Sequence, residues 1–360
     1  MAPLIERTSA LQRLRTLGKG LTTPLSPDDY LALINPLWTQ RELRGRVEKV
    51  VAETENAATL VIRPGWGWSF DHAPGQYIGI GVEIDGRFHW RSYSLSSVPL
   101  VEGRTVSITV KAMPEGFLSE HLVNGLEPGT IVRLATPQGD FVVPDPPPEK
   151  MLMLVGGSGI TPIMSILRTL DRRGSLPDAV LSYSARHRED MMFHDELHEL
   201  AQRAEHLTFV PRFTDDEGML EIERLDDVCH DWMERETWAC GPAPMLDALT
   251  DHYRRLGRED HLHVERFNLA VTDGGEGGTV TFGVGGPTVE VDGATTLLDA
   301  GEKAGVNMLF GCRMGICHTC DVPLASGRVR DLRSGDEHGE PGEYVQTCIS
   351  VAAGDCTLSL

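Results

Sequence analysis

The sequence predicts a multidomain protein in which an antiparallel β-barrel is followed by a doubly wound α/β domain and a small α+β domain. Three observations support this fold class. The 360 residues exceed what one ordinary hydrophobic core accommodates. Short runs of alternating apolar and polar residues fill positions 44–143, and beyond them apolar strands alternate with helical patterns. From residue 279 onward, a hairpin pattern precedes another helical pattern.

Six strand-like runs, separated by Gly, Pro and Asp residues, predict the barrel, because this rhythm is typical of antiparallel sheets. The runs are RVEKVVAE, ATLVIRP, YIGIGVEI, RFHWRSYSLSS, TVSITVKA and TIVRLATP. Residues 1–43 precede them as an N-terminal extension with two short helical patterns. In the second pattern, SPDDYLALINPLW, Pro27 occupies the first helical position, where proline is favoured.

A proline-rich segment at residues 143–150, VPDPPPEK, marks the end of the barrel, because proline lacks an amide donor and fixes φ. The strands MLMLVGG, AVLSYSA, LTFVPRF and TWACG then alternate with helical patterns, which predicts a parallel sheet. The Gly-rich segment VTDGGEGG is predicted to be a flexible linker. The predicted segments are therefore 1–43, 44–146, 147–270, 271–278 and 279–360.

Composition excludes several classes of function. The net charge of −20 argues against nucleic-acid binding, because an acidic surface repels phosphate. No stretch approaches 18 consecutive apolar residues, so no transmembrane helix is expected. The N-terminus has no signal-peptide pattern, so we expect a cytoplasmic protein. In a reducing compartment its cysteines indicate metal binding or catalysis rather than disulfides.

Four of the seven cysteines have the spacing C-x4-C-x2-C…C, which is that of plant-type [2Fe-2S] ligation. They are Cys312, Cys317, Cys320 and Cys348. Four thiolates suit two irons, with three ligands from one loop and the fourth from elsewhere. A zinc site is the alternative, but zinc knuckles favour two C-x2-C pairs and only one is present. The fragment CRMGICHTC also resembles the plant-type ferredoxin consensus, which implies a β-grasp fold for the last domain. Cys229 and Cys356 are expected to be core residues.

The segment RSYSLSS, residues 91–97, resembles the R-x-Y-S flavin-binding motif of the ferredoxin–NADP reductase superfamily, and PGQY precedes it as in that family. The resemblance implies that Arg91 neutralises a flavin phosphate, that Tyr93 packs on the isoalloxazine ring and that Ser94 hydrogen-bonds near its N5 atom. The structural alternative is an Arg and a Tyr that only stabilise a half-buried strand.

Two further loops resemble phosphate-binding segments of the same superfamily. GFLSEHL is similar to its pyrophosphate loop, with Gly116 permitting close approach and Ser119 at a helix N-terminus. A pyrophosphate to hold favours FAD, and FMN remains the alternative. GGSGITP follows an apolar strand and opens a helix with Thr161 at the N-cap, and free amides at such a helix start attract a pyrophosphate. The glycines of this nicotinamide-nucleotide loop are Gly156, Gly157 and Gly159.

The remaining candidate residues lie at the ends of predicted parallel strands, where open α/β sheets bind their ligands. In CGPAPM the family places Cys240 beside the nicotinamide, and an ordinary buried cysteine is the alternative. By resemblance, Glu265 and Phe267 lie near the flavin and nicotinamide rings. Ser184 and Arg186 follow the strand AVLSY with no early acidic residue to hold a ribose hydroxyl. This pattern favours NADPH over NADH.

The resemblance covers residues from about 44 to 360 and implies a reductase that passes electrons from NADPH through FAD and [2Fe-2S] to a partner protein. The segments LSPDDYLALINPLWTQRELRGRVEKV and PGWGWSFDHAPGQY resemble the actinobacterial reductases that serve membrane-bound di-iron acyl-CoA (stearoyl-CoA) Δ9 desaturases. Leucines among basic residues in the first turns are consistent with peripheral contact with the inner face of the plasma membrane or with the partner protein. A disordered tail and a helix packed on the barrel are the structural alternatives. Three alternatives stay open: a reductase for a soluble Rieske or aromatic-ring oxygenase, a redox-sensing flavo-iron–sulfur regulator, and a zinc-stabilised interaction protein.

Overall fold

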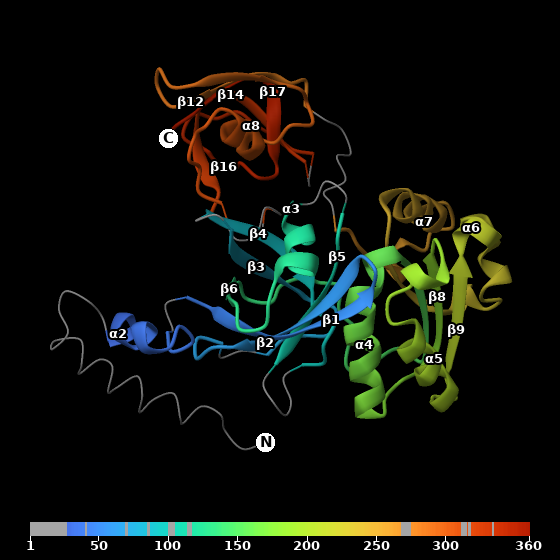
Figure 1. Ribbon diagram of the computed structural model, residues 1–360. Coiled ribbons are helices and arrows are strands. Elements are labelled where there is room, and N and C mark those ends of the chain that lie inside the picture. Colours follow the sequence, from blue (N-terminus) through green and yellow to red (C-terminus); the bar gives the residue numbers. More distant parts are fainter. Residues whose placement is uncertain are drawn as a thin grey trace.

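The computed structural model describes most of the chain, and Figure 1 shows how its parts are arranged. The described residues are 27–39, 42–68, 71–84, 87–99, 105–113, 117–267, 275–310, 315, 318–332 and 335–360. Three sheets form three units in chain order, which confirms the predicted fold class. Within the described part, no helix has the length and apolar character needed to cross a lipid bilayer.

The first unit is a six-stranded antiparallel barrel with the strand order β4-β3-β6-β1-β2-β5. Its strands are β1 (Arg44–Thr54), β2 (Ala57–Pro64), β3 (Tyr77–Ile84), β4 (Arg87–Ser94), β5 (Val106–Lys111) and β6 (Ile131–Leu134). Alternate side chains, such as those of Ile78, Ile80 and Val82, point into one buried apolar cluster because strand side chains alternate between faces. Helix α2 (Pro27–Ile34) precedes the barrel and begins at Pro27, as the sequence predicts. Helix α3 (Phe117–Glu120) continues into the π-helix His121–Gly125.

The second unit is a five-stranded parallel sheet with the order β11-β10-β7-β8-β9. Its strands are β7 (Lys150–Gly156), β8 (Asp178–Ala185), β9 (Leu207–Phe213), β10 (Glu236–Cys240) and β11 (Leu262–Glu265). Its α-helices are α4 (Ile160–Arg173), α5 (His194–Arg203), α6 (Thr214–Glu217) and α7 (Ala243–Arg255). Its 3-10 turns are Gly157–Gly159, Arg188–Asp190, Ile222–Asp227, Trp232–Glu234 and Glu259–His261.

Both faces of this parallel sheet are covered, which makes the unit doubly wound. Met151 and Met153 of β7 pack into the apolar cluster that includes α4 and α5. Leu152 and Leu154 of the same strand pack into a second cluster, which includes α7. A strand buried on both faces reads as the continuous apolar run MLMLV, because neither face needs polar residues.

The third unit is an α+β domain whose sheet has the order β13-β12-β17-β14-β15, with β16 paired to β14. Its strands are β12 (Gly278–Phe282), β13 (Thr288–Val291), β14 (Asp321–Asp331), β15 (Glu337–His338), β16 (Tyr344–Gln346) and β17 (Ser350–Leu358). The predicted hairpin is the antiparallel β12–β13 pair. Helix α8 (Leu297–Lys303) begins where the Thr296 hydroxyl accepts the Asp299 amide at 3.1 Å, which is a standard N-cap.

The predicted linker, residues 271–278, differs from the structure at its end. Gly277 bridges to Ala353, and Gly278 is the first residue of β12. Both glycines have positive φ angles, and a Cβ on either would approach neighbouring backbone to within 2.6 Å or less. These glycines therefore allow close packing in the sheet rather than flexibility. Residues 271–274 of this prediction lie outside the described residues.

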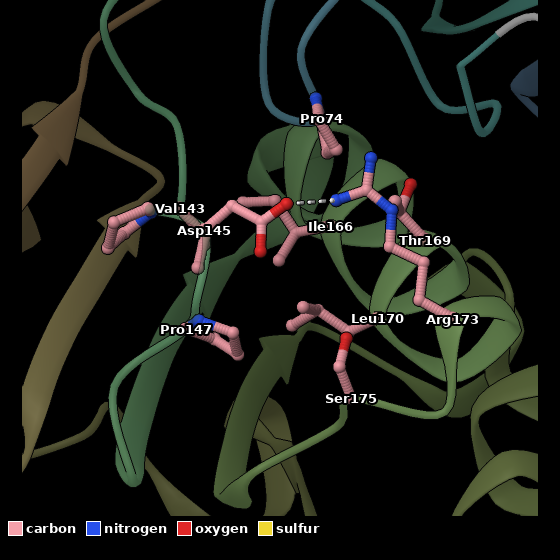
Figure 2. A pocket seen from close by; sticks show the side chains of 10 residues that line it. Pro74, Val143, Asp145, Pro147, Ile166, Thr169, Leu170, Arg173 and Ser175 are labelled. Atoms are coloured by element: carbon pink, nitrogen blue, oxygen red, sulfur yellow. Dashed lines mark ion pairs between the residues drawn. The ribbon is translucent and has the colours of Figure 1, made fainter. Parts of the chain in front are cut away.

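The barrel and the parallel-sheet unit pack along helix α4, which lies between them in Figure 1. Figure 2 shows a small pocket at this boundary, where Asp145 faces Arg173 of α4 with an N–O distance of 3.6 Å. Its cavity of about 20 Å³ has room for about one water molecule and no cofactor. The position of α4 therefore determines how the two units meet.

Candidate functional site

The end of β4 places two buried hydroxyl groups on the strand face that points away from the barrel core, because Tyr93 between them packs against that core. The Oγ atoms of Ser92 and Ser94 are buried, and neither has a hydrogen-bond partner among the described residues. Antiparallel pairing with β3 fixes their positions, opposite Gly79 and Tyr77 respectively. A buried hydroxyl group without a hydrogen-bond partner destabilises the folded protein. Their arrangement therefore fits a site where a polar ligand supplies the missing hydrogen bonds.

Tyr93 lies between these two serines and is largely buried. Burial raises the pKa of its phenol to about 12, so the side chain is neutral at physiological pH. Arg91 is exposed, and its Nη1 donates to the Trp90 carbonyl at 2.9 Å. An exposed guanidinium two residues before a neutral aromatic ring fits a flavin that has a charged phosphate end and an apolar ring.

The predicted pyrophosphate loop is described only in part. Gly116 lies outside the described residues. Ser119 is the third residue of α3, and its hydroxyl accepts the Met113 amide at 3.1 Å. The structure thus uses Ser119 to hold the strand-to-helix connection after β5. The phosphate contact predicted for this residue stays a prediction.

The second unit brings a carboxyl group to the flavin-motif strand. Glu265 is the last residue of β11, and its Oε2 atom is buried without a hydrogen-bond partner among the described residues. Burial raises the pKa of Glu265 to about 8, and the nearby Ser94 hydroxyl only partly offsets this effect. The hydroxyl is near enough to lower the pKa but does not reach full hydrogen-bond geometry. A protonatable group therefore lies where the two domains meet.

The nucleotide loop connects β7 to α4 through a short 3-10 turn at Gly157–Gly159. Gly157 has a φ of +55°, and a Cβ on Gly159 would lie 2.0 Å from the Cys240 carbonyl oxygen. A Cβ on Gly156 would lie 2.6 Å from Cδ of Pro242. The loop therefore packs tightly on the segment that follows β10, and only glycine permits this approach.

The predicted N-cap of this helix is wrong. Helix α4 begins at Ile160 with Gly159 as N-cap, so Thr161 is already helical. The Thr161 hydroxyl donates to the Ser158 carbonyl at 3.0 Å and does not cap a free amide. The preceding 3-10 turn starts the winding earlier than the threonine signal indicates. No side chain caps α4, and its first amide, that of Ile160, already donates to the Gly157 and Ser158 carbonyls. A pyrophosphate would therefore be received by the 3-10 turn Gly157–Gly159 that precedes the helix.

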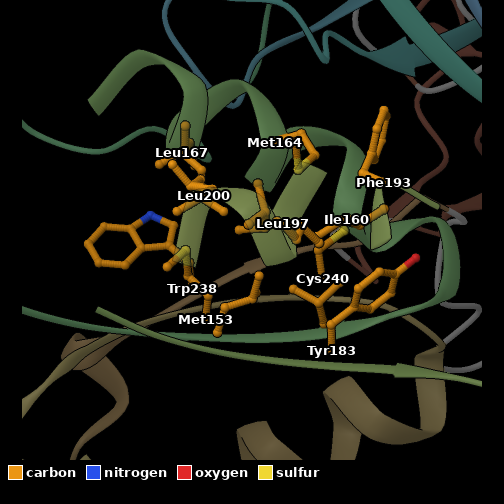
Figure 3. Close-up of a cluster of buried hydrophobic side chains, with 14 of the residues drawn as sticks. Met153, Ile160, Met164, Leu167, Tyr183, Phe193, Leu197, Leu200, Trp238 and Cys240 are labelled. Atoms are coloured by element: carbon orange, nitrogen blue, oxygen red, sulfur yellow. The ribbon is translucent and has the colours of Figure 1, made fainter. Parts of the chain in front are cut away.

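Cys240 lies at the carboxyl end of β10 with its side chain in the core. Figure 3 shows it among Tyr183, Ile160 and other apolar side chains, and it is 0 % exposed. Burial raises the pKa of this thiol well above its ordinary value, and the adjacent Glu265, paired to it across β10–β11, raises it further. The thiol is therefore neutral. Phe267, two residues past Glu265, is 38 % exposed.

The end of β8 presents one exposed cation without an ion-pair partner among the described residues. Ser184 is half-buried within the strand, and Arg186 follows it and is exposed. The next two basic residues each face an acidic side chain. Nε2 of His187 lies 3.3 Å from Oδ2 of Asp215, and Nη2 of Arg188 lies 3.8 Å from Oδ1 of Asp195. Arg186 therefore remains available to a phosphate.

Two of the four predicted cluster ligands are described, and they lie together. The Sγ atoms of Cys320 and Cys348 are 3.3 Å apart, and the Gly315 amide donates to the Cys348 sulfur at 3.3 Å. Two thiolates on one tetrahedral metal ion lie about 3.8 Å apart, so the pair needs little movement to share an iron. Cys312 and Cys317 lie outside the described residues, among which no group of three metal-binding side chains occurs. Cys229 and Cys356 are buried in apolar clusters, as predicted.

Ser92 is not among the site residues that the sequence predicts. Its hydroxyl is buried and unpartnered like that of Ser94, two residues further along β4. The period-two alternation of a strand places residues 92 and 94 on one face and would have identified it.

Comparison with known proteins identifies the three units. Residues 48–143 match the oxidoreductase FAD-binding domain, residues 153–251 the oxidoreductase NAD-binding domain and residues 282–353 the 2Fe-2S iron-sulfur cluster binding domain. Together with the sites above, they define an oxidoreductase that uses NAD(P)H, FAD and a [2Fe-2S] cluster. The predicted enzyme class and cofactors are thereby confirmed.

The chain is 54 % identical to an NADPH oxidoreductase of Mycobacterium tuberculosis over 99 % of its own length and 94 % of the relative. It is 30 % identical to the glycine betaine monooxygenase reductase subunit of Pseudomonas aeruginosa, covering 90 % of this chain and 98 % of that one. The fold matches the solved phthalate dioxygenase reductase with a TM-score of 0.61, at 20 % identity, over 89 % of this chain and 98 % of that one. This chain therefore belongs to the ferredoxin reductase-type family of flavin and iron–sulfur oxidoreductases.

Proposed function

We propose that this protein is an electron-transfer reductase that takes electrons from NADPH and delivers them singly to an oxygen-activating partner protein. The observation that supports this path of electron transfer is that the Ser94 side chain lies beside the Glu265 carboxyl group. This proximity brings the flavin-motif strand to the carboxyl edge of the parallel sheet, where the nucleotide loop also ends. Two cofactor sites on different domains thus open toward one another.

The cofactors supply the redox chemistry: NADPH donates a hydride, FAD accepts both electrons and passes them on singly, and the cluster carries one. The protein positions them. Ser92 and Ser94 offer hydroxyls to the flavin ring, Arg91 offers charge to its phosphate end, and Glu265 holds a proton close to the ring. The 3-10 turn Gly157–Gly159, which precedes α4, receives the nucleotide pyrophosphate. Cys312, Cys317, Cys320 and Cys348 hold the cluster.

Arg186 supports NADPH as the electron donor. A guanidinium after strand β8, with no carboxylate partner among the residues that the structure describes, binds a 2′-phosphate more strongly than a neutral ribose hydroxyl. The M. tuberculosis relative is described as an NADPH oxidoreductase, which agrees with this assignment.

The acceptor we propose is a membrane-bound di-iron acyl-CoA desaturase. The N-terminal segments that resemble desaturase reductases support it. Helix α2, which belongs to this extension, exposes Leu33 by 80 % and Ile34 by 73 %, so the described part of the extension carries an apolar surface. Deleting residues 1–24 should leave dye reduction unchanged and lower coupling to the membrane partner. Unchanged coupling would remove the extension from this role.

A soluble oxygenase is the second candidate acceptor. Its support is the likeness to the glycine betaine monooxygenase reductase subunit and to the ferredoxin reductase component of 3-ketosteroid-9-alpha-monooxygenase from Mycolicibacterium smegmatis, which is 31 % identical over 79 % of this chain. Both relatives lie much further from this chain than the 54 % identical oxidoreductase does. We therefore rank this acceptor second.

Reconstitution separates the acceptors. The purified holoprotein is supplied with NADPH and, in parallel, with membranes that contain an acyl-CoA desaturase or with a soluble Rieske oxygenase. We expect double-bond formation in the first mixture at a rate at least tenfold above that of electron delivery in the second. Efficient delivery only to the oxygenase would transfer the assignment to the second candidate. Slow NADPH oxidation that no acceptor accelerates would favour a redox sensor.

A further inference from the structure

Helix α4 contacts the flavin-motif strand directly. The Ser165 hydroxyl donates to the Ser97 carbonyl at 2.7 Å, and Nη1 of Arg168 donates to the Ser96 carbonyl at 2.6 Å. Ser165 and Arg168 are three residues apart and so lie on one face of the helix. Both carbonyls belong to the three residues that follow Ser94. One helix face of the nucleotide domain thus binds the segment that leaves the flavin motif.

Arg168 is held on three sides, which makes its contact rigid. Its Nε and Nη2 atoms donate to the two carboxylate oxygens of Glu196 at 2.7 and 2.5 Å. The guanidinium carbon also lies 4.9 Å from the centre of the Phe193 ring. A planar guanidinium with a bidentate carboxylate, an aromatic ring and a carbonyl has one orientation that satisfies all three. The position of α4 is therefore transmitted to Ser96.

The segment around Ser96, directly after β4, also forms hydrogen bonds with strand β5 of the barrel. The Ser96 amide donates to the Ser107 carbonyl at 2.8 Å, and the Ser96 hydroxyl lies 2.9 Å from that of Thr109. Thr109 in turn contacts the Thr59 hydroxyl at 2.7 Å, and Thr59 donates to Glu53 at 2.6 Å. Hydrogen bonds thus run from β1 and β2 through β5 to the end of β4. The barrel therefore holds the segment that α4 contacts, so the two contacts fix the position of α4 relative to the barrel.

Helix α4 begins immediately after the nucleotide loop, and Ser165 and Arg168 lie in its second and third turns. A helix is stiff over this length, so the loop and the two side chains move together. We propose that Ser165 and Arg168 are positioning residues that set the separation between the nucleotide loop and the flavin-motif strand. They touch neither reactant and act through the Ser96 and Ser97 carbonyls. This inference rests on the proposed function, because it assigns a role within the same hydride transfer.

The test compares Arg168→Met with a matched control on the same two helices. Arg203→Met removes an ion pair between α5 and Asp171 of α4, with an N–O distance of 2.9 Å, that does not involve the barrel. Each holoprotein is examined for its FAD and cluster absorption, the equilibrium Kd for NADP+ and the limiting rate of flavin reduction at saturating NADPH. Hydrogen–deuterium exchange of peptides that contain residues 95–97 reports the contact without turnover.

We expect Arg168→Met to keep both chromophores and a Kd within about threefold of wild type. Its limiting rate should fall between about 10- and 100-fold, because misplacement of reacting atoms by about 1 Å has effects of this size. Exchange at residues 95–97 should accelerate. Arg203→Met should change neither the limiting rate nor the exchange at residues 95–97. Arg168→Lys keeps a cation that can bind one partner, so it should recover part of the rate.

The inference is overturned if Arg168→Met reduces flavin within twofold of the Arg203→Met rate, or if the whole loss lies in the Kd. Should Arg168→Met not fold, Ser165→Ala decides in its place, because a single lost hydroxyl should still slow flavin reduction several-fold at constant Kd. A wild-type protein that lacks FAD or is not reduced by NADPH would instead contradict the proposed function itself.

Discussion

Glu265 has an acid–base equilibrium that differs from that of an ordinary surface carboxylate. Burial at the domain junction raises its pKa from 4.5 to about 8, and the Ser94 hydroxyl offsets only part of the loss of hydration. Across much of the physiological range, Glu265 is therefore a neutral acid that can donate a hydrogen bond. Such a group suits a position where a proton is held beside a redox ring.

Replacing Glu265 with Gln should change how stability depends on pH. Between pH 4.5 and about 8 the folded protein keeps a proton that the unfolded chain has lost, so wild-type stability falls as pH rises and levels off above pH 8. The loss across this window is on the order of a few kcal/mol. Glu265→Gln lacks this titration, so its stability should exceed that of wild type increasingly toward pH 8. Denaturant unfolding at pH 5, 6.5 and 8 measures the difference, and parallel curves for the two proteins would contradict it.

Arg186 allows a prediction about nucleotide choice. Arg186→Ala removes a charge-assisted hydrogen bond of about 1.5–3 kcal/mol to a 2′-phosphate, which corresponds to a rise in the KM for NADPH of about 10- to 150-fold. The KM for NADH should stay within about twofold, because NADH has no phosphate at that position. Steady-state kinetics with both nucleotides measures the two values. Arg188→Ala is the control, since Arg188 already faces Asp195. An equal change for both nucleotides would exclude the proposed contact.

At the scale of elements, the nucleotide loop depends on the close approach of two strand ends. Gly159 meets the Cys240 carbonyl, and Gly156 meets Pro242, so β7 and β10 end against one another. Backbone contacts of this kind leave no room for a Cβ. They also explain why CGPAPM and GGSGITP occur together in one chain, since each loop shapes the other.

Gly159→Ala should disrupt this loop. The new methyl group would overlap the Cys240 carbonyl at 2.0 Å, so the backbone must shift and nucleotide binding should weaken at least tenfold. Gly174→Ala, at the other end of α4, is the matched control: its φ is +64° and nothing lies within 4 Å. The control should cost about 1 kcal/mol in stability through backbone strain and leave nucleotide binding unchanged. Titration with NADP+ and thermal melting separate the two effects, and equal affinities would refute the packing argument.

At the scale of the whole molecule, the proposed nucleotide and flavin sites lie on two units that meet at one interface. The predicted cluster ligands belong to a third unit. Because each unit has its own buried core, a lesion in the cluster site need not unfold the others. Two-electron and one-electron steps should therefore be separable by mutation.

Cys348→Ala should remove the cluster and spare flavin reduction. We expect loss of the visible iron–sulfur absorption and at least a tenfold slower reduction of cytochrome c, while NADPH still reduces the flavin at the wild-type rate. Cys356→Ala is the control, because this buried cysteine is not a predicted ligand and its loss should cost only about 1 kcal/mol. Full cluster absorption in Cys348→Ala would exclude this residue as a ligand.

Much of this architecture was predictable because its signals are local. Six alternating runs predicted the barrel, the apolar run MLMLV predicted a strand of the parallel sheet, and Pro27 marked the start of α2. Two local signals failed for physical reasons. Thr161 did not cap α4 because a 3-10 turn already winds the chain before it. The glycines at 277 and 278 pack in a sheet because their conformational freedom serves close approach instead of flexibility.

The sequence by itself predicted the classes of cofactor: cysteine spacing indicated the [2Fe-2S] cluster, and motifs that resemble those of a known superfamily indicated a flavin and a nicotinamide nucleotide. These signals are legible because each lies in a short stretch of sequence. Only the tertiary structure decided the environment of those residues. The meeting of Ser94 with Glu265, the burial of Cys240 and the contact between Arg168 and Ser96 each join segments far apart in the chain. Hydration and hydrogen bonding depend on which surfaces pack together, and no short stretch of sequence contains that information.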